Sequence, residues 1–187
     1  WELEKAMREA GAEAMAFDVL VASGPNAALP HHHPGERPLQ PGDALIVDMG
    51  AQVAGYKSDL TRTFFLGAEP DDLFRQIFAV AQAAQTAVFQ HARPGQNGNE
   101  VDAIGRDVIR EAGYGDYFGH GLGHGVGLDI HERPFFTFTP AGEGHTLTVG
   151  MVVTVEPGIY VPGWGGVRLE ELCLVTESGL EAISKCG

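Results

Sequence analysis

Five short motifs constrain the fold of this chain more than any other feature. In chain order they are IVDMG, SDLTRTF, GHGLGHGVGLDIHE, TVEPGIY and GVRLEE. Each places a polar side chain beside apolar or glycine-rich sequence, where an unpaired charge is costly to bury. An Asp beside Gly is more often a turn residue, so the argument rests on the whole set. The residues concerned are Asp48, Asp59, His124, Glu156 and Glu170.

Length and charge set broad limits on what the chain can be. Its 187 residues are enough for one domain with a real core, and 44% hydrophobic against 20% charged residues is a globular composition. Lys and Arg number 12 and Asp and Glu 25, for a net charge of −13. Such acidity argues against nucleic acid or an anionic membrane as a partner. Four of the acids would be offset if they hold two divalent cations.

Cysteine content and hydropathy bear on the compartment. The two cysteines, Cys173 and Cys186, form neither a disulfide framework nor a CxxC zinc site. Cys173 lies in the apolar run LCLV and is expected to be a small buried side chain. The sequence has no signal-peptide pattern and no apolar run long enough to cross a bilayer. We therefore expect a cytoplasmic protein.

The order of helical and strand patterns favours an α+β fold. Several strands accompany each helical segment without regular βα alternation, which predicts an antiparallel or mixed sheet. No linker divides the chain. Helices are expected over residues 2–10, 71–92 and 100–112, and strands over residues 17–22, 43–49, 52–56 and 61–66, with glycine-rich, strand-like sequence from residue 115 onward.

Asp48 and Asp59 can meet only if the chain turns between them. Their separation is odd, so one continuous strand would put them on opposite faces. A turn around Gly55 would fold the second strand back and let both carboxylates converge. Asp48 directly follows the apolar run ALIV, and metal ligation is one standard compensation for a carboxylate in such a place.

The GHGLGHGVGLDIHE segment is the most specific of the five. Its alternating glycines leave little side-chain bulk, so the backbone can pack tightly against a site, and histidine is the commonest metal ligand. The segment is not a GxGxxG nucleotide loop. HERPF also fails the HExxH zinc motif, because Phe135 stands four residues after His131. The histidines of the segment are His120, His124 and His131.

Glu156 and Glu170 complete a set of four carboxylates and one imidazole. Each follows a β-branched or aliphatic run, and Glu171 should point to the opposite face from Glu170 because neighbouring strand residues alternate. Oxygen-rich ligation suits Mn²⁺ better than a structural zinc. Two such ions, roughly 3.5–4 Å apart, could activate a water and polarise a carbonyl. No GxSxG nucleophile motif competes with this reading.

From about residue 7 to residue 179 the chain resembles the pita-bread metallopeptidases, the family of methionine aminopeptidase, aminopeptidase P and Xaa-Pro dipeptidase. The resemblance implies a curved antiparallel or mixed sheet covered by helices. It also implies a dinuclear centre of Mn²⁺, with Co, Fe or Zn as alternatives. Asp59 and Glu170 would bridge the two ions. The implied ligands are Asp48, Asp59, His124, Glu156 and Glu170.

The proline-specific branch fits better than methionine aminopeptidase, on GPNAALPHHHP, SDLTRTF, DIHERP and EPGIYVPGWGGVRLEE. By this resemblance His31 is the substrate-side histidine, with His32 as the alternative. His120 and His131 would contact substrate carbonyl or carboxylate groups. Arg168 would either anchor a substrate carboxylate or pair with an acid near the site. Glu156 would also be the general base, while a metal and a histidine hold the oxyanion.

The implied activity is hydrolysis of X–Pro bonds by an Xaa-Pro dipeptidase acting as a homodimer. Aminopeptidase P, acting on longer peptides with proline at P1′, and a non-catalytic binding module are the alternatives. Two features depart from the family. Glu171 stands where the family usually has Asp, and residues 1–187 are expected to form one catalytic domain that lacks an N-terminal domain and part of its first helix.

Overall fold

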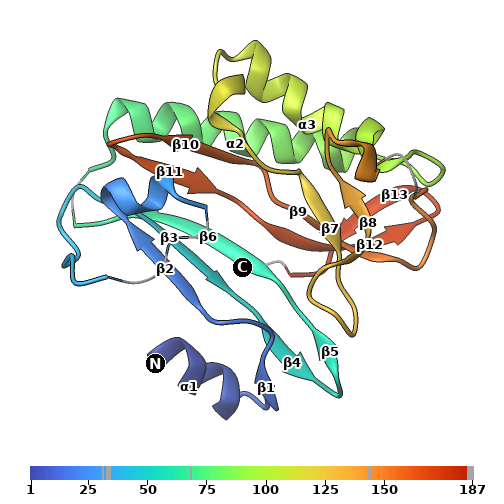
Figure 1. The fold of residues 1–187 in the computed structure, drawn as a ribbon, viewed down its shortest axis with the longest axis horizontal. Helices are drawn as coiled ribbons and strands as arrows, with labels where there is room; N and C mark the ends of the chain where they lie inside the picture. Colours follow the sequence, from blue (N-terminus) through green and yellow to red (C-terminus); the bar gives the residue numbers. More distant parts are fainter. Residues whose placement is uncertain (31, 33–34, 68, 143–144, 185–187) are drawn as a thin grey trace.

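The computed structural model describes the whole chain except residues 31, 33–34, 68, 143–144 and 185–187. Curved antiparallel sheets form its body, and the two long helices lie together on one side of them (Figure 1). Its strand pairs are antiparallel in each of the sheets that the description covers. The α+β prediction is confirmed.

The first part of the chain forms two three-stranded sheets, ordered β2-β3-β6 and β1-β4-β5. The strand expected over residues 17–22 begins only at Leu20, and the one expected over residues 52–56 is a hairpin of two short strands. The elements are α1 (Glu2–Glu9), β1 (Ala14–Met15), β2 (Leu20–Ser23), the 3₁₀ helix η1 (Gly24–Ala28), β3 (Ala44–Met49), β4 (Ala51–Val53), β5 (Tyr56–Lys57) and β6 (Leu60–Phe65).

The second part supplies the long helices, a five-stranded sheet ordered β13-β12-β9-β7-β8 and the β10-β11 pair. Its elements are α2 (Asp72–His91), α3 (Gly98–Glu111), the 3₁₀ helix η2 (Gly115–Tyr117), β7 (Gly123–Gly125), β8 (Glu132–Phe136), the 3₁₀ helix η3 (Pro140–Gly142), β9 (Val152–Val155), β10 (Gly158–Val161), β11 (Gly165–Arg168), β12 (Glu171–Thr176) and β13 (Gly179–Ala182).

Each of the two long helices begins with a side-chain cap. The Asp71 carboxylate accepts a hydrogen bond from the N–H of Phe74 at 2.6 Å. Asn97 and Glu100 form a capping box, in which each side chain accepts from the other residue's backbone N–H. Such caps typically contribute about 1 kcal/mol each. They fix the entry of each helix and so its rotation toward the sheets.

The core lies between the long helices and the sheets. The inward face of α2 carries a heptad-like series of buried side chains, and α3 adds Val101 and Ile109. Burying an aliphatic or aromatic side chain contributes roughly 1.5–3 kcal/mol. Cys173, a small buried side chain as expected, belongs to the same core. The buried residues of α2 are Phe74, Ile77, Ala81, Ala84 and Val88.

The β4–β5 hairpin turns the chain back, as expected around Gly55. Its two loop residues both have positive φ, 51° at Ala54 and 82° at Gly55, which is the pattern of a two-residue I′ turn. The chain then returns as β6, antiparallel to β3, with Asp48 opposite Thr61. Side chains at Asp48, Asp59 and Thr61 therefore share one face, because residues two apart in an extended chain point the same way.

Candidate metal centre and catalytic cleft

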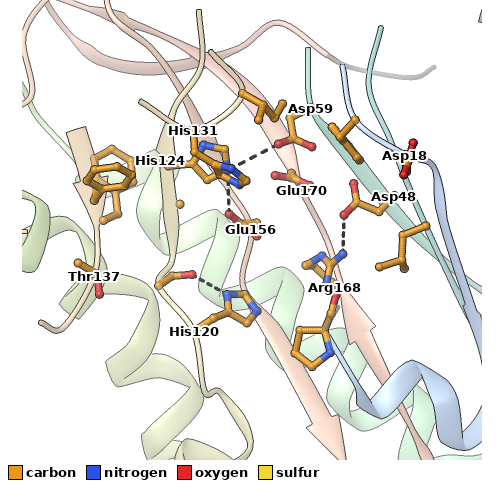
Figure 2. Close-up of a pocket in the computed structure, with 18 of the residues that line it drawn as sticks. Asp18, Asp48, Asp59, His120, His124, His131, Thr137, Glu156, Arg168 and Glu170 are labelled. Atoms are coloured by element: carbon orange, nitrogen blue, oxygen red, sulfur yellow. Dashed lines mark hydrogen bonds and ion pairs between the residues drawn. The ribbon is translucent and has the colours of Figure 1, made fainter. Parts of the chain in front are cut away.

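A cleft of about 840 Å³ lies on the side of the sheets away from α2 and α3 and contains a candidate metal ligand from each of the five motifs (Figure 2). Its size is that of an ordinary small-ligand site. Apolar side chains such as Phe17, Leu20, Ile130 and Phe135 form much of its wall. The candidate site residues on its surface are Asp48, Asp59, His120, His124, His131, Glu156, Arg168 and Glu170.

The glycines around His120 and His124 let the backbone pass close to its neighbours. A Cβ at residue 121 would lie 2.5 Å from the carbonyl oxygen of Phe136. At residue 123 it would clash with the carbonyl oxygen of Thr154. The short strand β7 can therefore lie between β8 and β9, with the His124 side chain directed at the acids. The tight packing expected of this segment is observed.

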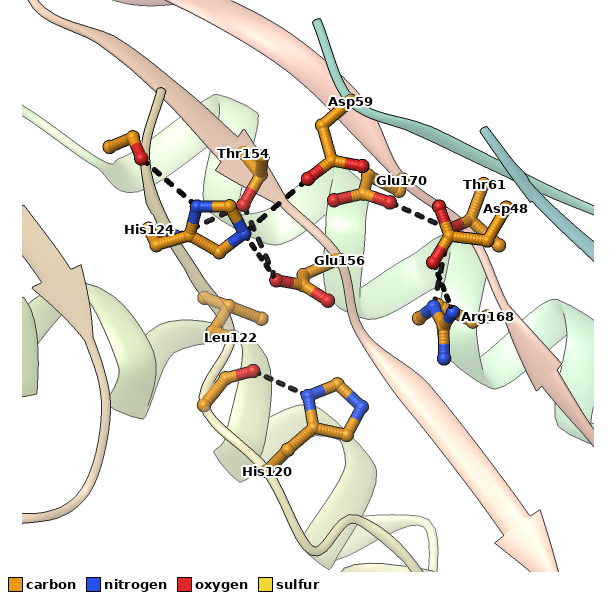
Figure 3. Close-up of polar contacts among 12 residues, drawn as sticks. Asp48, Asp59, Thr61, His120, Leu122, His124, Thr154, Glu156, Arg168 and Glu170 are labelled. Atoms are coloured by element: carbon orange, nitrogen blue, oxygen red, sulfur yellow. Dashed lines mark hydrogen bonds and ion pairs between the residues drawn. The ribbon is translucent and has the colours of Figure 1, made fainter. Parts of the chain in front are cut away.

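Three candidate ligands form a compact buried group. Suitable ligand atoms of Asp59, His124 and Glu170 all lie within 4.8 Å of one another. The Nε2 atom of His124 is 3.6 Å from an Asp59 oxygen and 3.4 Å from Glu156 Oε1. Glu156 thus lies at the edge of the same group (Figure 3). Its side chain keeps 16% exposure, so it faces the open cleft.

Asp48 stands beside this group and is held by Arg168. The Arg168 Nη2 donates to Asp48 Oδ2 at 2.6 Å, and the arginine side chain is only 5% exposed. Among the residues described, none makes a hydrogen bond to the buried Oδ1 of Asp48. A buried carboxylate oxygen without a donor is costly, and a cation in this cleft would satisfy it. For Arg168, the structure favours pairing with an acid over free access to a substrate carboxylate.

Neutral side chains fix the position of the two glutamates. Thr61 Oγ1 donates to Glu170 Oε2 at 2.6 Å and accepts from Arg168 Nε at 3.2 Å. From α2, the Gln85 amide donates at 3.1 Å to the carbonyl oxygens of both Val155 and Leu169. Those carbonyls immediately precede Glu156 and Glu170. One helix side chain therefore ties the two acid-bearing chain segments together.

Burial and mutual repulsion shift the pKa values of these acids upward. Burial, then the charges of Asp48 and Glu156, raises the pKa of Asp59 to about 8. Burial is also the main cause of the raised pKa values of Glu156 and Glu170. Burial lowers the pKa of His124, which favours the neutral, metal-ligating form. A divalent cation would reverse the balance by stabilising every carboxylate. The donor set therefore fits a cation.

The other predicted histidines have different surroundings. His120 is held on both ring nitrogens, by the carbonyl of Gly121 at 2.7 Å and the Tyr160 hydroxyl at 2.8 Å. His131 is an exposed residue of the cleft whose ring lies 4.3 Å from that of His124. His32 lines the cleft as well. His31, the first choice for the substrate-side histidine, lies outside the described residues.

Several residues that support the site were not predicted from the sequence. Tyr160 accepts from Arg168 Nη1 at 3.0 Å and links it to His120. Both Tyr160 and Thr61 lie inside the recognised motifs, so their proximity to the acids was the available signal. For Gln85 the sequence signal was weak: a polar side chain next to the apolar face of a helix. Glu171, predicted to face away, does so: it pairs with Arg62 at 2.7 Å and lies outside the cleft lining.

Comparison with known families identifies the fold. A family model described as metallopeptidase family M24 matches residues 1–177. The chain belongs to this metallopeptidase family. The resemblance inferred from the five motifs is thereby confirmed, and with it the pita-bread architecture.

Relatives within M24 are similar over nearly the whole chain. The Xaa-Pro dipeptidase of Pyrococcus furiosus is 44% identical over 184 residues, which are 98% of this chain and 52% of that protein. A solved structure of prolidase from the same organism superposes with a TM-score of 0.94 at 43% identity and covers 100% of this chain and 54% of the other. An X-Pro aminopeptidase structure from Thermotoga maritima gives 0.93 at 40% identity, covering 99% and 51%.

This chain thus spans about half the length of the M24 relatives that it matches. None of the helices in the described part has the length and apolar character needed to cross a membrane.

Proposed function

We propose that this M24 chain carries the hydrolytic site of a metal-dependent Xaa-Pro dipeptidase. The observation that carries the proposal is the convergence of four carboxylates and His124 in one cleft, with the pKa values of three of the acids raised. The dipeptidase and prolidase relatives, at 43–44% identity, support the substrate class. Residues 1–187 would form a single catalytic domain.

The proposed metal ligands are those predicted from the sequence, Asp48, Asp59, His124, Glu156 and Glu170. Their oxygen-rich chemistry favours two Mn²⁺ ions over a thiolate-loving metal. Asp59 and Glu170, whose ligand atoms lie within 4.8 Å of His124 and of each other, would hold the cations at the centre of this set. When bound, the cations supply Lewis acidity for the scissile carbonyl and lower the pKa of the attacking water.

Glu156 is the proposed general base. It lies at the open edge of the acid group, and burial raises the pKa of its carboxyl toward the neutral range in which a base is most effective. The hydroxyl of Thr154 lies 3.4 Å from its Oε1 and helps to orient it. Glu156 would accept a proton from the attacking water and return one to the departing proline nitrogen.

Recognition of an X–Pro bond must rely on shape, because its amide has no N–H to donate. The apolar wall at Phe17, Leu20 and Phe135 suits a proline ring and an aliphatic residue before it. His120 and His131 line the cleft and would contact substrate carbonyl or carboxylate oxygens. To donate to a substrate oxygen, His120 must release the Tyr160 hydroxyl and carry a proton on Nε2, since Nδ1 already bonds the Gly121 carbonyl.

Aminopeptidase P is the second candidate. The cleft is larger than a dipeptide requires, and the X-Pro aminopeptidase structure is 40% identical. A non-catalytic binding module is the third, and the presence of all five proposed ligands speaks against it. A homodimer and a cytoplasmic location belong to the proposal as well, and size-exclusion chromatography with light scattering tests the dimer.

The test is Mn²⁺-dependent hydrolysis of Leu-Pro beside Leu-Pro-Pro. Preference for the dipeptide supports a dipeptidase, and preference for the tripeptide supports aminopeptidase P. The matched controls are Glu170→Gln, which removes a proposed ligand, and Glu171→Gln, which removes the neighbouring acid outside the cleft. Bound Mn²⁺ without cleavage of either peptide would overturn the proposed activity and leave the binding module.

A further inference from the structure

Outside the acid group, a buried polar network joins α3 to the segment that carries His120. Asp102 and Arg106 lie one helical turn apart and form a two-pronged ion pair, with Nε to Oδ2 at 2.6 Å and Nη2 to Oδ1 at 2.9 Å. The Asp102 side chain is 1% exposed and that of Arg106 is 17% exposed. Burial of such a pair needs further hydrogen bonds to offset desolvation.

Those further bonds all go to the backbone of the segment 118–122. Arg106 donates to the carbonyl oxygens of Phe118 at 2.9 Å and of His120 at 2.6 Å. Asp102 accepts the N–H of Leu122 at 3.0 Å. One ion pair therefore holds the peptide groups on both sides of Gly121.

Holding these peptides also fixes two catalytic side chains. The Gly121 carbonyl can only accept, so the Nδ1 of neutral His120 carries the proton and Nε2 accepts from Tyr160. The Leu122 carbonyl accepts the backbone N–H of Glu156 at 2.8 Å. Figure 3 shows Leu122 between His120 and Glu156. The orientation of both residues thus depends on the segment 118–122, which the ion pair holds.

Two aromatic rings enclose the guanidinium. The Arg106 Cζ lies 4.2 Å from the ring centre of Phe118 and 4.3 Å from that of Phe138. Phe118 is also in edge contact with the His120 ring, at 5.0 Å between centres. A planar guanidinium suits both the stacking and the forked hydrogen bonds, whereas an ammonium suits neither.

We propose that Asp102 and Arg106 are positioning residues for the hydrolytic site. By holding the backbone peptide groups around Gly121, they set the tautomer and ring orientation of His120 and the position of Glu156 in the cleft. The expected effect on kcat rests on the proposed hydrolytic function. The expected effect on the tautomer and orientation of His120 does not depend on catalysis. Neither residue lines the cleft.

The variants are Arg106→Lys, which keeps the charge, and Arg106→Ala, with and without added guanidinium ion. The matched control is Arg110→Ala, because Arg110 on the same helix also pairs with an aspartate, Asp107 at 2.8 Å, but at the exposed surface. Five quantities are measured: bound Mn²⁺, the melting temperature, kcat and KM for Leu-Pro, and, in the Mn²⁺-free protein, the ¹⁵N signals of the His120 ring.

We expect Arg106→Ala to lower kcat about 100-fold, since small displacements at a reacting centre have costs of that order. KM and Mn²⁺ content should stay within about threefold of the parent, because the substituted side chain touches neither substrate nor proposed ligands. Guanidinium should restore at least a tenth of the lost rate in Arg106→Ala and change nothing in Arg110→Ala. Arg106→Lys should resemble Arg106→Ala, because the fork is lost.

The ring signals separate this proposal from the proposed function. The parent should show a single His120 tautomer with Nδ1 protonated, and Arg106→Ala a mixture that guanidinium reverses. Unchanged His120 signals in a folded Arg106→Ala protein would overturn the positioning role. So would a loss of kcat that follows only the melting temperature and is not rescued. If the parent cleaves no X–Pro peptide, the proposed function fails while the ring signals still decide this inference.

Discussion

Arg168 holds one oxygen of Asp48 at 2.6 Å, while the other oxygen of that carboxylate is buried without a hydrogen bond from any described residue. The arginine thereby points the second oxygen toward the acids around His124 (Figure 2). Burial lowers the pKa of Arg168, but the charges of Tyr160, Asp48 and the glutamates outweigh burial and raise it. The arginine remains a cation throughout and contributes the positive charge nearest to Asp48.

Replacing Arg168 by Lys should therefore weaken metal binding more than it destabilises the fold. Lysine keeps the charge but cannot contact Asp48, Tyr160 and Thr61 together, as Arg168 does. Loss of such an orienting contact typically lowers metal affinity 10–100-fold. Titration calorimetry with Mn²⁺ measures the change. Parent-like affinity in Arg168→Lys would show that Asp48 needs no fixed orientation.

Two adjacent glutamates provide a controlled test of the metal site. Glu170 is 2% exposed within the acid group, whereas Glu171 points away and pairs with Arg62. We expect Glu170→Gln to lose most Mn²⁺ binding and all metal-dependent hydrolysis, yet to remain folded because the side-chain volume is kept. Glu171→Gln should bind Mn²⁺ normally and lose about 1 kcal/mol of stability.

Metal content by mass spectrometry and the free energy of unfolding by urea titration distinguish the two variants. Full activity of Glu170→Gln with added Mn²⁺ would contradict the ligand assignment. The reverse pattern, with Glu171→Gln empty of metal, would show that the strand register was misassigned.

The metal-free protein should lose stability as the pH rises. The pKa of Asp59 is about 8 in the fold against an ordinary 3.8, and those of Glu156 and Glu170 are raised as well. Between these values the folded state binds more protons than the unfolded state, so the free energy of unfolding falls as the pH increases. The contribution is full below about pH 4 and lost by about pH 8.

In EDTA, we expect a loss of roughly 3–4 kcal/mol between pH 5 and pH 8, which corresponds to roughly 6–16 °C in Tm for a domain of this size. The neutral variant Asp59→Asn should show a clearly shallower slope. Saturating Mn²⁺ should stabilise the protein more at pH 8 than at pH 5, because binding must displace fewer protons there. A metal-free stability that rises with pH would refute the repulsion among these acids.

Much of the site could be predicted because its residues stand in local motifs. The odd separation of Asp48 and Asp59 required a turn, and the turn lies at Ala54–Gly55 with β6 returning beside β3. Alternation along a strand correctly assigned Glu171 to the outer face. The alternating glycines predicted a close backbone approach, which Gly121 and Gly123 make.

What could not be predicted depends on contacts between distant segments. Residues 17–19 have strand composition, yet β2 starts at Leu20, and Phe17 to Val19 line the cleft instead. The sequence VRLEELCLV reads as one strand, but β11 ends at Arg168 and β12 starts at Glu171. Glu170 lies in the break, where the Thr61 hydroxyl binds it. Such pairings come from tertiary packing, which neither periodicity nor propensity encodes.

The side-chain amide of Gln85 supports two acids from outside the cleft. It donates to the carbonyls of Val155 and Leu169, one residue before Glu156 and Glu170. Gln85→Leu would leave both carbonyls without this donor, at a cost of about 1–3 kcal/mol in the free energy of unfolding. Because both proposed ligands would also be less well held, we expect Mn²⁺ affinity to fall about 10-fold.

Gln82 is the matched control, since it is an exposed glutamine on the same helix, and Gln82→Leu should change neither quantity. Urea unfolding in EDTA measures the stability of each variant, and calorimetry measures Mn²⁺ affinity. A Gln85→Leu protein that is less stable but binds Mn²⁺ like the parent would show that the amide supports the fold alone. In that case the Thr61 hydroxyl and Arg168, which contact the acids directly, would be sufficient to place them.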